Sequence, residues 1–196
     1  MLLGNFADVS TGLVLSRKVA DITDKHGKLY KLLTLKSFNN DGWINDEYID
    51  SFDSGEVLLE KYITKSNDLV IRLSSPYTCI PINRDNEGLL VPSQFALIRI
   101  NNAGINPYYL AYALNSEVIR KEYIRISLGA TIPVIKVETL RMTEIPIPNT
   151  EKQELISKIW ELMTKQKKLY HQLIHDIEEK NKQIERKIME GIENGY

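Results

Sequence analysis

The sequence predicts an α+β protein, in which a mixed, β-rich domain with short helices is followed by one long C-terminal α-helix that forms a coiled coil. Two observations support this prediction. Before residue 149, short runs rich in Leu, Ile and Val alternate with turn signals built from Gly, Pro, Asn and Asp. After Pro148 there is no further proline, the next glycine is Gly191, and apolar residues recur every seven positions. We therefore assign residues 1–148 to the domain, 149–192 to the helix and 193–196 to a disordered tail.

The composition excludes several classes of protein. With 43% hydrophobic and 26% charged residues, the chain of 196 residues has the composition of a globular protein rather than a disordered one. Its formal net charge of -1 excludes a generally basic surface, so any anion-binding surface has to be local. The single cysteine, Cys79, excludes an internal disulfide framework and a cysteine-rich zinc site. Because neither an apolar run of about 20 residues nor a basic leader occurs, we expect no membrane span and a cytoplasmic location.

Four strands and one helix are expected in the domain. The strands are Tyr30–Leu35, Asp68–Leu73, Leu89–Val91 and Ala96–Ile100. Turn signals separate them at residues 39–42, 74–76, 85–88 and 101–104. For the helix, Asn106 can cap the N-terminus, Pro107 suits the first helical position, and Tyr108–Arg120 carries helical apolar spacing.

The long helix has its own start signals. Thr150 is a suitable N-cap, and Glu151 and Glu154 stand in the first turn, where the helix dipole favours acids. At ~1.5 Å per residue, a helix from Glu151 to Glu190 would reach roughly 60 Å, which is longer than a domain of this size needs.

The apolar pattern of this helix predicts what it packs against. A row at heptad spacing, together with neighbouring apolar positions, forms a seam with charged flanks: Ile156, Met163, Tyr170, Leu173, Ile174, Ile177, Ile184 and Ile188. Leu155, Leu162 and Leu169 widen the stripe in the first half, as expected if that half also lies on the domain. The helix could instead fold back on its own domain. The distal seam argues against this, because nothing else in the chain is long enough to cover it. We therefore expect a second copy or another protein to pair with it.

No catalytic or metal site is expected. His171 and His175 are spaced like a helical metal pair, but they flank the apolar stripe and no Glu completes a zinc-protease motif. Phosphate-binding and dinucleotide-binding glycine loops are missing from the sequence. The segment Asn106–Tyr109 is similar to the Asn/Asp-Pro-Pro-aromatic loop of amino-group DNA methyltransferases, but it lacks the second proline and no glycine-rich cofactor loop accompanies it. We interpret it as a capped helix and expect no cofactor in this chain.

The order of motifs along the chain resembles one half of the specificity subunit of type I restriction–modification systems. The exit from the domain carries the resemblance best, since Ile145-Pro-Ile-Pro148 leads directly into the long helix. The segments that carry the resemblance are Thr11–Lys18, Tyr30–Lys36, Asp41–Ile44, Asp68–Arg72, Leu89–Gln94, Asn106–Asn115, Gly129–Pro133, Leu140, Ile145–Pro148 and Glu151–Ile156.

The resemblance implies a function. Residues 1–148 would be a target recognition domain that reads one half of a split double-stranded DNA site, and the helix would be the spacer that sets the gap between the halves. The spacer would also dock methyltransferase subunits, which carry S-adenosylmethionine chemistry on adenine, and indirectly the restriction subunit. Family members hold two recognition domains and two helical regions, whereas this chain holds one of each. This chain would therefore be either a half-length subunit that works as a homodimer or a fragment of a longer chain. We expect it to be non-catalytic by itself, and a homodimer would read an inverted-repeat target.

The residues that would contact DNA are basic and polar side chains of the domain. Arg and Lys suit guanine edges or phosphates, Gln suits adenine, and hydroxyls donate to phosphates. The candidates are Arg17, Lys18, Lys31, Lys36, Arg72, Arg84, Ser93, Gln94, Arg99, Arg125, Thr131, Lys136 and Arg141. From Asp41 to Glu60 there are seven acidic residues and no basic one, and we expect that stretch to lie away from the duplex. The alternative is a coiled-coil interaction scaffold that binds no DNA.

Overall fold

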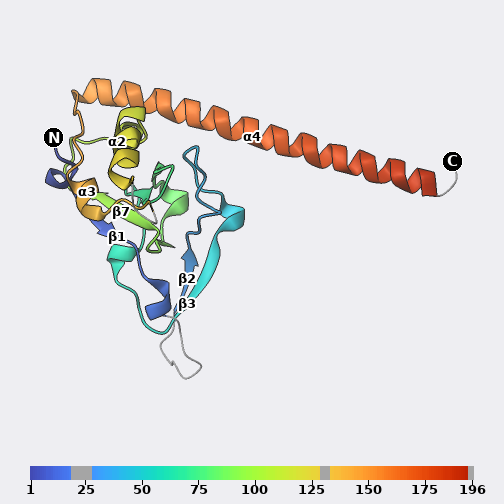
Figure 1. Cartoon of the computed structure of the whole chain (residues 1–196), viewed down its shortest axis with the longest axis horizontal. Coiled ribbons are helices and arrows are strands. Elements are labelled where there is room, and N and C mark those ends of the chain that lie inside the picture. Colours follow the sequence, from blue (N-terminus) through green and yellow to red (C-terminus); the bar gives the residue numbers. More distant parts are fainter. Residues whose placement is uncertain (19–27, 129–132, 194–196) are drawn as a thin grey trace.

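The protein consists of a folded domain, which we call the head, and one long helix, which we call the rod. The structure, a computed structural model, describes residues 1–18, 28–128 and 133–193. Two small sheets and three short helices form the head, and the helix α4 (Thr150–Glu193) runs along one side of the head and then projects away from it (Figure 1). The predicted α+β class is therefore confirmed.

The first sheet lies at the centre of the head. Its strands are β1 (Ala7–Thr11), β7 (Phe95–Ile100), β4 (Leu69–Arg72) and β5 (Cys79–Pro81), in the order β1-β7-β4-β5, and all neighbours are antiparallel. Side chains along β4 alternate between the two faces, so Leu69 and Ile71 enter one core cluster and Val70 enters another. Because both faces are covered, all three of these side chains are fully buried.

The second sheet is smaller and lies beside the first. Its order is β3 (Asp50–Ser54), β2 (Lys28–Leu32), β6 (Leu89–Leu90), with β2 antiparallel to β3 and parallel to β6. Tyr30 and Phe52 face a third core cluster. Short 3-10 turns connect the elements of the head: η1 (Leu3–Asn5), η2 (Leu15–Arg17), η3 (Asp46–Tyr48), η4 (Glu60–Tyr62) and η5 (Arg84–Asn86).

The four predicted strands correspond to β2, β4, β6 and β7, with their bounds shifted by up to three residues. Three strands were not predicted. β5 is only three residues long, β3 lies inside the acidic stretch, and the polar, alternating β1 is an edge strand. Such segments become strands through pairing with a neighbour rather than through their own propensity. At the predicted turns, Gly42 and Gly88 adopt φ values of +108° and +80°, which favour glycine.

The predicted single helix 108–120 is wrong, because it is divided into α1 (Pro107–Leu114) and α2 (Glu117–Ser127). The start is as predicted: the Asn106 side chain accepts the backbone N–H groups of Tyr108 and Tyr109. The break lies at Asn115, whose side chain binds the backbone of Cys79 in β5 rather than continuing the helix. Ser116 then caps α2. A further short helix, α3 (Val137–Arg141), follows.

The N-cap of the rod lies one residue before the predicted one. The side chain of Asn149 accepts the backbone N–H of Lys152 at 3.1 Å, so Asn149 is the N-cap and Thr150 is already helical. The helix continues to Glu193, which we had assigned to the tail, and at ~1.5 Å per residue its 44 residues span roughly 66 Å. The rest of the expected tail, residues 194–196, lies outside the described residues.

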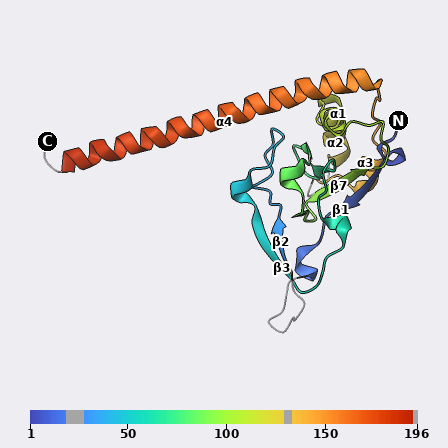
Figure 2. The ribbon, with the colours of Figure 1, turned by 180° about the vertical axis from the view of Figure 1, so that it is seen from behind.

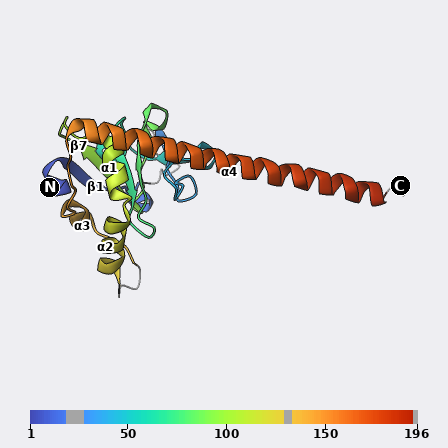
Figure 3. The same cartoon turned by 90° about the horizontal axis from the view of Figure 1, so that it is seen from above.

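Gln153 fastens the rod to the head. Its side chain accepts the backbone N–H of Asn106 at 2.9 Å and donates to the carbonyls of Gly104 at 3.1 Å and Pro148 at 3.0 Å. Gln153 is almost fully buried, and Ile156 and Trp160 pack on the core of the head nearby. The rod therefore crosses the N-terminal end of α1 in a defined place (Figure 3).

The apolar stripe of the rod faces away from the head. Leu155, Leu162 and Leu169 are between 55% and 67% exposed, so the prediction that they lie on the domain is wrong. At 3.6 residues per turn they stand on the side opposite Gln153 and Trp160 and continue the row of Met163 and Tyr170. Ile156, expected in the seam, instead packs partly against the head.

A second contact joins the rod to the loop of residues 39–43. The carboxylate of Asp41 lies 3.1 Å from Nζ of Lys167 and 3.2 Å from Nε2 of His171, and the Trp43 ring meets the His171 ring edge-on at 5.3 Å. Partial burial raises the pKa of Asp41, but the hydrogen bond and charge of Lys167 and the charge of His171 outweigh this and lower it below its ordinary value. The C-terminal part of the rod extends away from the head (Figure 2).

We predict that this second contact sets the direction of the rod relative to the head. Spin labels on Glu117→Cys in α2 and Glu185→Cys in α4 would report the distance between head and rod, which changes with the direction of the rod. The native Cys79 is buried and should not take up a label. By pulsed electron–electron double resonance, we expect a narrow distribution of this distance in the protein with both labels. The distribution should broaden when Asp41→Asn and Trp43→Ala are added together. Asp46→Asn, an exposed acid of the same stretch that does not contact the rod, is the control. An unchanged distribution in the double variant would show that Gln153 and Trp160 suffice.

Candidate nucleic-acid interface

The acidic stretch 41–60 lies beside three of the predicted DNA-contacting lysines. Its strand β3 is paired with β2, where Lys31 stands opposite Ser51. Lys18 forms an ion pair with Glu56, and Nζ of Lys36 lies 4.0 Å from the ring centre of Tyr48. The two expectations, that these lysines contact DNA and that the acids lie away from it, therefore conflict in space. Since the acidic side chains repel phosphates, their position weakens the three lysines as candidates, and DNA contact by these lysines stays a prediction.

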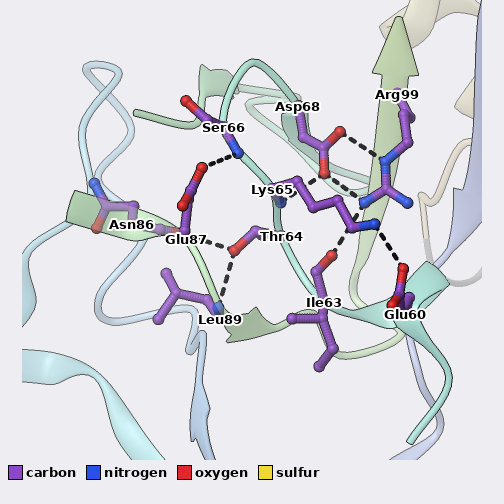
Figure 4. A network of polar contacts seen from close by, with 10 residues as sticks. All are labelled: Glu60, Ile63, Thr64, Lys65, Ser66, Asp68, Asn86, Glu87, Leu89 and Arg99. Carbon is purple, nitrogen blue, oxygen red and sulfur yellow. Dashed lines mark hydrogen bonds and ion pairs between the residues drawn. The ribbon is translucent and has the colours of Figure 1, made fainter. Parts of the chain in front are cut away.

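Arg99 is engaged inside the head rather than free for DNA. Its guanidinium donates to both carboxylate oxygens of Asp68, at 2.9 and 2.6 Å, and to the carbonyl of Ile63 at 3.1 Å (Figure 4). The Asp68 side chain is only 4% exposed. The hydrogen bonds to Asp68 raise the pKa of Arg99 against the effect of its own partial burial. This pair connects β7 to the loop that precedes β4, so the assignment of Arg99 to the DNA surface is not supported.

The loop that precedes β4 is held by further polar contacts of its residues 64–66. Lys65 pairs with Glu60, the backbone N–H of Ser66 donates to Glu87 at 2.7 Å, and the hydroxyl of Thr64 binds Asn86 and Leu89 (Figure 4). The charged side chains around this loop therefore mostly pair with one another or with backbone groups.

Two further candidates are paired along their own helices. Arg125 binds Glu122 in α2, and Arg141 binds Glu138 in α3. Arg141 also donates to the carbonyl of Val9 at 2.7 Å, which docks α3 on β1. The acid beside each of these arginines repels a phosphate, which makes Arg125 and Arg141 weaker candidates for DNA contact.

The remaining candidates have no carboxylate partner among the described residues. Four of them gather at one end of the first sheet, and we call Arg72, Ser93, Gln94 and Lys136 the β4-end patch. Arg72 ends β4 opposite Phe95, the backbone N–H of Leu73 binds the carbonyl of Gln94, and the N–H of Ile135 binds the carbonyl of Leu73. Three chain segments far apart in sequence thus meet there. Arg17 in η2 and Arg84 in η5 belong to other parts of the head, and Thr131 lies outside the described residues.

A residue missed by the sequence reasoning lies next to this patch. Arg120 of α2 is half-buried and donates to the side chains of Asn115 at 2.7 Å and Thr78 at 3.4 Å. Its burial lowers the pKa of the guanidinium, which nevertheless stays charged in proteins. The sequence offers no signal for this role, because Arg120 is an ordinary solvent-face residue of an amphipathic helix until β5 packs beside it.

Neither histidine of the rod belongs to a metal site of the described chain. Groups of three or more His, Cys, Asp or Glu side chains able to hold a metal ion do not occur within residues 1–18, 28–128 and 133–193. His171 instead contacts Asp41 and Trp43. Over the same described ranges, no helix is both long and apolar enough to cross a bilayer.

The chain is similar to known proteins of one kind. The pattern of the family described as type I restriction modification DNA specificity domain matches residues 3–184. No curated protein matches the chain by sequence.

Three solved structures have the same fold. A chain from a type I R-M system, studied for its complex assembly and conformational transition, is 15% identical with a TM-score of 0.61 over 97% of this chain and 44% of its own length. The HsdS subunit from Thermoanaerobacter tengcongensis is 14% identical with a TM-score of 0.60 over 94% of this chain and 46% of its own. The S subunit of a type I system from M. genitalium is 16% identical with a TM-score of 0.50 over 81% and 37%. This chain therefore spans less than half the length of these structures.

We predict that Arg99 stabilises the head and does not bind DNA. Arg99→Ala leaves the buried carboxylate of Asp68 without its counter-charge and should lower the free energy of unfolding by about 2–4 kcal/mol. Urea denaturation followed by circular dichroism measures this. Arg84→Ala, which removes an exposed arginine of η5 without a carboxylate partner in the described chain, should change stability by less than about 0.5 kcal/mol. Full stability in Arg99→Ala combined with weaker DNA binding would return Arg99 to the interface.

Proposed function

This chain belongs to the family of type I restriction modification DNA specificity domains, and we propose that it reads one half of a split double-stranded DNA target. The observation that carries the proposal is the family match over residues 3–184, which includes the whole β4-end patch. At this patch Arg72 and Lys136 lack carboxylate partners in the described chain, whereas Lys18 is paired with Glu56 and Lys65 with Glu60. In this function the chain supplies sequence specificity and carries no catalytic residue of its own.

The rod supports the second part of the proposal, that two copies pair. Thirteen large apolar side chains along the rod are between 46% and 67% exposed, and eleven of them form the stripe. These eleven are Leu155, Ile159, Leu162, Met163, Leu169, Tyr170, Leu173, Ile174, Ile177, Ile184 and Ile188. A continuous apolar stripe of this length is rare on a monomer and marks an interaction site. Since the head covers the opposite side of the rod, a second rod can lie on the stripe without displacing the head.

Pairing of two rods in antiparallel orientation would place the two heads at opposite ends of a coiled coil. The twofold axis between them makes the two reading surfaces equivalent, so the target would be an inverted repeat. A rod of roughly 66 Å corresponds to nearly two turns of duplex at roughly 34 Å per turn. The rod would thus act as the spacer between the half-sites.

The partners of the dimer would be methyltransferase subunits, which bring S-adenosylmethionine and the chemistry on adenine, and indirectly a restriction subunit. The likeness of this fold to a chain of a type I R-M system supports the proposal. The alternative function is a coiled-coil scaffold that binds no DNA, which the neutral net charge and the exposed stripe favour equally. Binding to duplex DNA separates the two.

We predict an inverted-repeat target. Mapping modified adenines in the DNA of cells that carry this chain with its methyltransferase subunit should give two half-sites of the same sequence in opposite orientation. Cells with the methyltransferase subunit alone are the control and should show no such modified sites. Two unrelated half-sites would contradict the homodimer, because a twofold-symmetric reader cannot present two different surfaces.

We predict that the rod is the dimer contact. Ile177→Asp with Ile184→Asp puts two charges into the seam, where their desolvation is unfavourable, and should convert a dimer into a monomer in light scattering. Gln183→Asp with Arg186→Asp is the control, because both positions lie outside the seam. An unchanged mass in the seam variant would place the dimer contact elsewhere or exclude the dimer.

A further inference from the structure

We propose that Arg72 and Arg120 together bind one phosphate of the DNA backbone, beside the loop that contacts the rod. The inference rests on the proposed function and gives it a specific anchoring point. It starts from Arg120, which neither the sequence pattern nor the family resemblance singled out.

Arg120 is a charge without a counter-charge. Its guanidinium is half-buried, its hydrogen bonds go only to the neutral side chains of Asn115 and Thr78, and its Nε atom is buried with no hydrogen-bond partner in the described chain. Taking a charge out of water without an ionic partner is unfavourable, and native proteins rarely leave such a group unsatisfied. The exposed part of the guanidinium therefore has capacity for an external anion.

Three other arginines of the head do have an acidic partner. Arg99 has Asp68, Arg141 has Glu138, and Arg125, five residues along the same helix as Arg120, has Glu122. Arg120 is more buried than Arg125 and yet is the one that lacks an acid. An arrangement that only served stability would pair the more buried cation first.

Arg72 brings a second guanidinium to the same place. It donates to Oγ of Ser74 at 3.0 Å and to Oδ1 of Asn40 at 3.4 Å, and it has no carboxylate partner in the described chain. The hydroxyl of Thr78, which Arg120 contacts, donates to the carbonyl of the same Asn40 at 3.0 Å. Asn40 and Thr78 thus lie between the two arginines and hold them on one small area of surface.

The acid whose charge acts on Arg120 does not fill this site. Asp41 follows Asn40 in the chain and its charge acts on Arg120, but its carboxylate is bonded to Lys167 and His171 of the rod. The anion that binds two guanidinium groups has to come from outside the described chain. A phosphodiester fits because two planar forks with nearby hydroxyls match its two unesterified oxygens.

The phosphate site and the β4-end patch form one surface. Arg72 belongs to both, and Gln94 and Lys136 lie at the same end of the first sheet. A phosphate held by the two arginines would fix the register of the duplex on the head, and the patch would then meet the adjoining groove.

The test compares the full-length protein with Arg72→Gln, Arg120→Gln and Arg120→Lys, and with Arg125→Gln as the matched control on the same helix. Fluorescence anisotropy on a random-sequence duplex at several salt concentrations gives the affinity and its salt dependence. We expect Arg72→Gln and Arg120→Gln each to weaken binding about tenfold and to reduce the slope of log affinity against log salt by about 1. Arg125→Gln should change neither quantity.

Two controls separate binding from folding. Arg120→Lys keeps the charge and should retain most of the salt slope, while circular dichroism verifies that each variant is folded. Inorganic phosphate should raise the midpoint of thermal unfolding, relative to chloride of equal ionic strength, in the wild-type protein and in Arg125→Gln, and less in Arg72→Gln and Arg120→Gln.

Two outcomes would overturn the inference in different ways. Wild-type affinity and salt slope in the folded Arg72→Gln and Arg120→Gln variants would exclude this site and leave the proposed function intact. Absence of any salt-sensitive binding by the wild-type protein, even with the methyltransferase subunit present, would exclude both the site and the proposed function.

Discussion

The attachment of the rod to the head by one side only is the contact on which the rest of the molecule depends. Gln153 joins the first turn of the rod to Asn106 and Gly104, and Trp160 and the Asp41 contact continue along the same side. Because these residues occupy that side, the apolar stripe must face outwards over its entire length. An exposed stripe on a firmly held rod gives the molecule a defined direction in which to meet a partner.

The cations of the head fall into two groups, those paired with acids and those without an acidic partner in the described chain. The chain is nearly neutral, and several cations of the head pair with neighbouring acids, as Arg99 does with Asp68 and Lys65 with Glu60. Arg72, Arg120 and Lys136, which have no acidic hydrogen-bond partner in the described chain, lie around the end of β4. For a protein that binds a polyanion, such a group concentrates the attraction for phosphates on one area of the head.

Local signals were sufficient for some elements and misleading for others. The Asn106 cap and the turn glycines Gly42 and Gly88 act through contacts within a few residues, so the sequence predicted them correctly. Asn115 broke the predicted helix because it binds β5, which is distant in the chain. For the same reason the DNA candidates could be listed but not sorted: whether an arginine is paired depends on acids that only the folded chain brings near it.

The sequence by itself determined the two-part organisation, the α+β class, the length of the rod and the family, because periodicity, punctuation and motif order are properties of the chain. Tertiary structure alone decided which side of the rod is exposed. The sequence pattern of Leu155, Leu162 and Leu169 is equally compatible with a side that faces the head. Only the contacts of Gln153 and Trp160 show that the opposite side faces it. It also decided that Arg120 carries an uncompensated charge, because burial and pairing are defined only by neighbours from other segments.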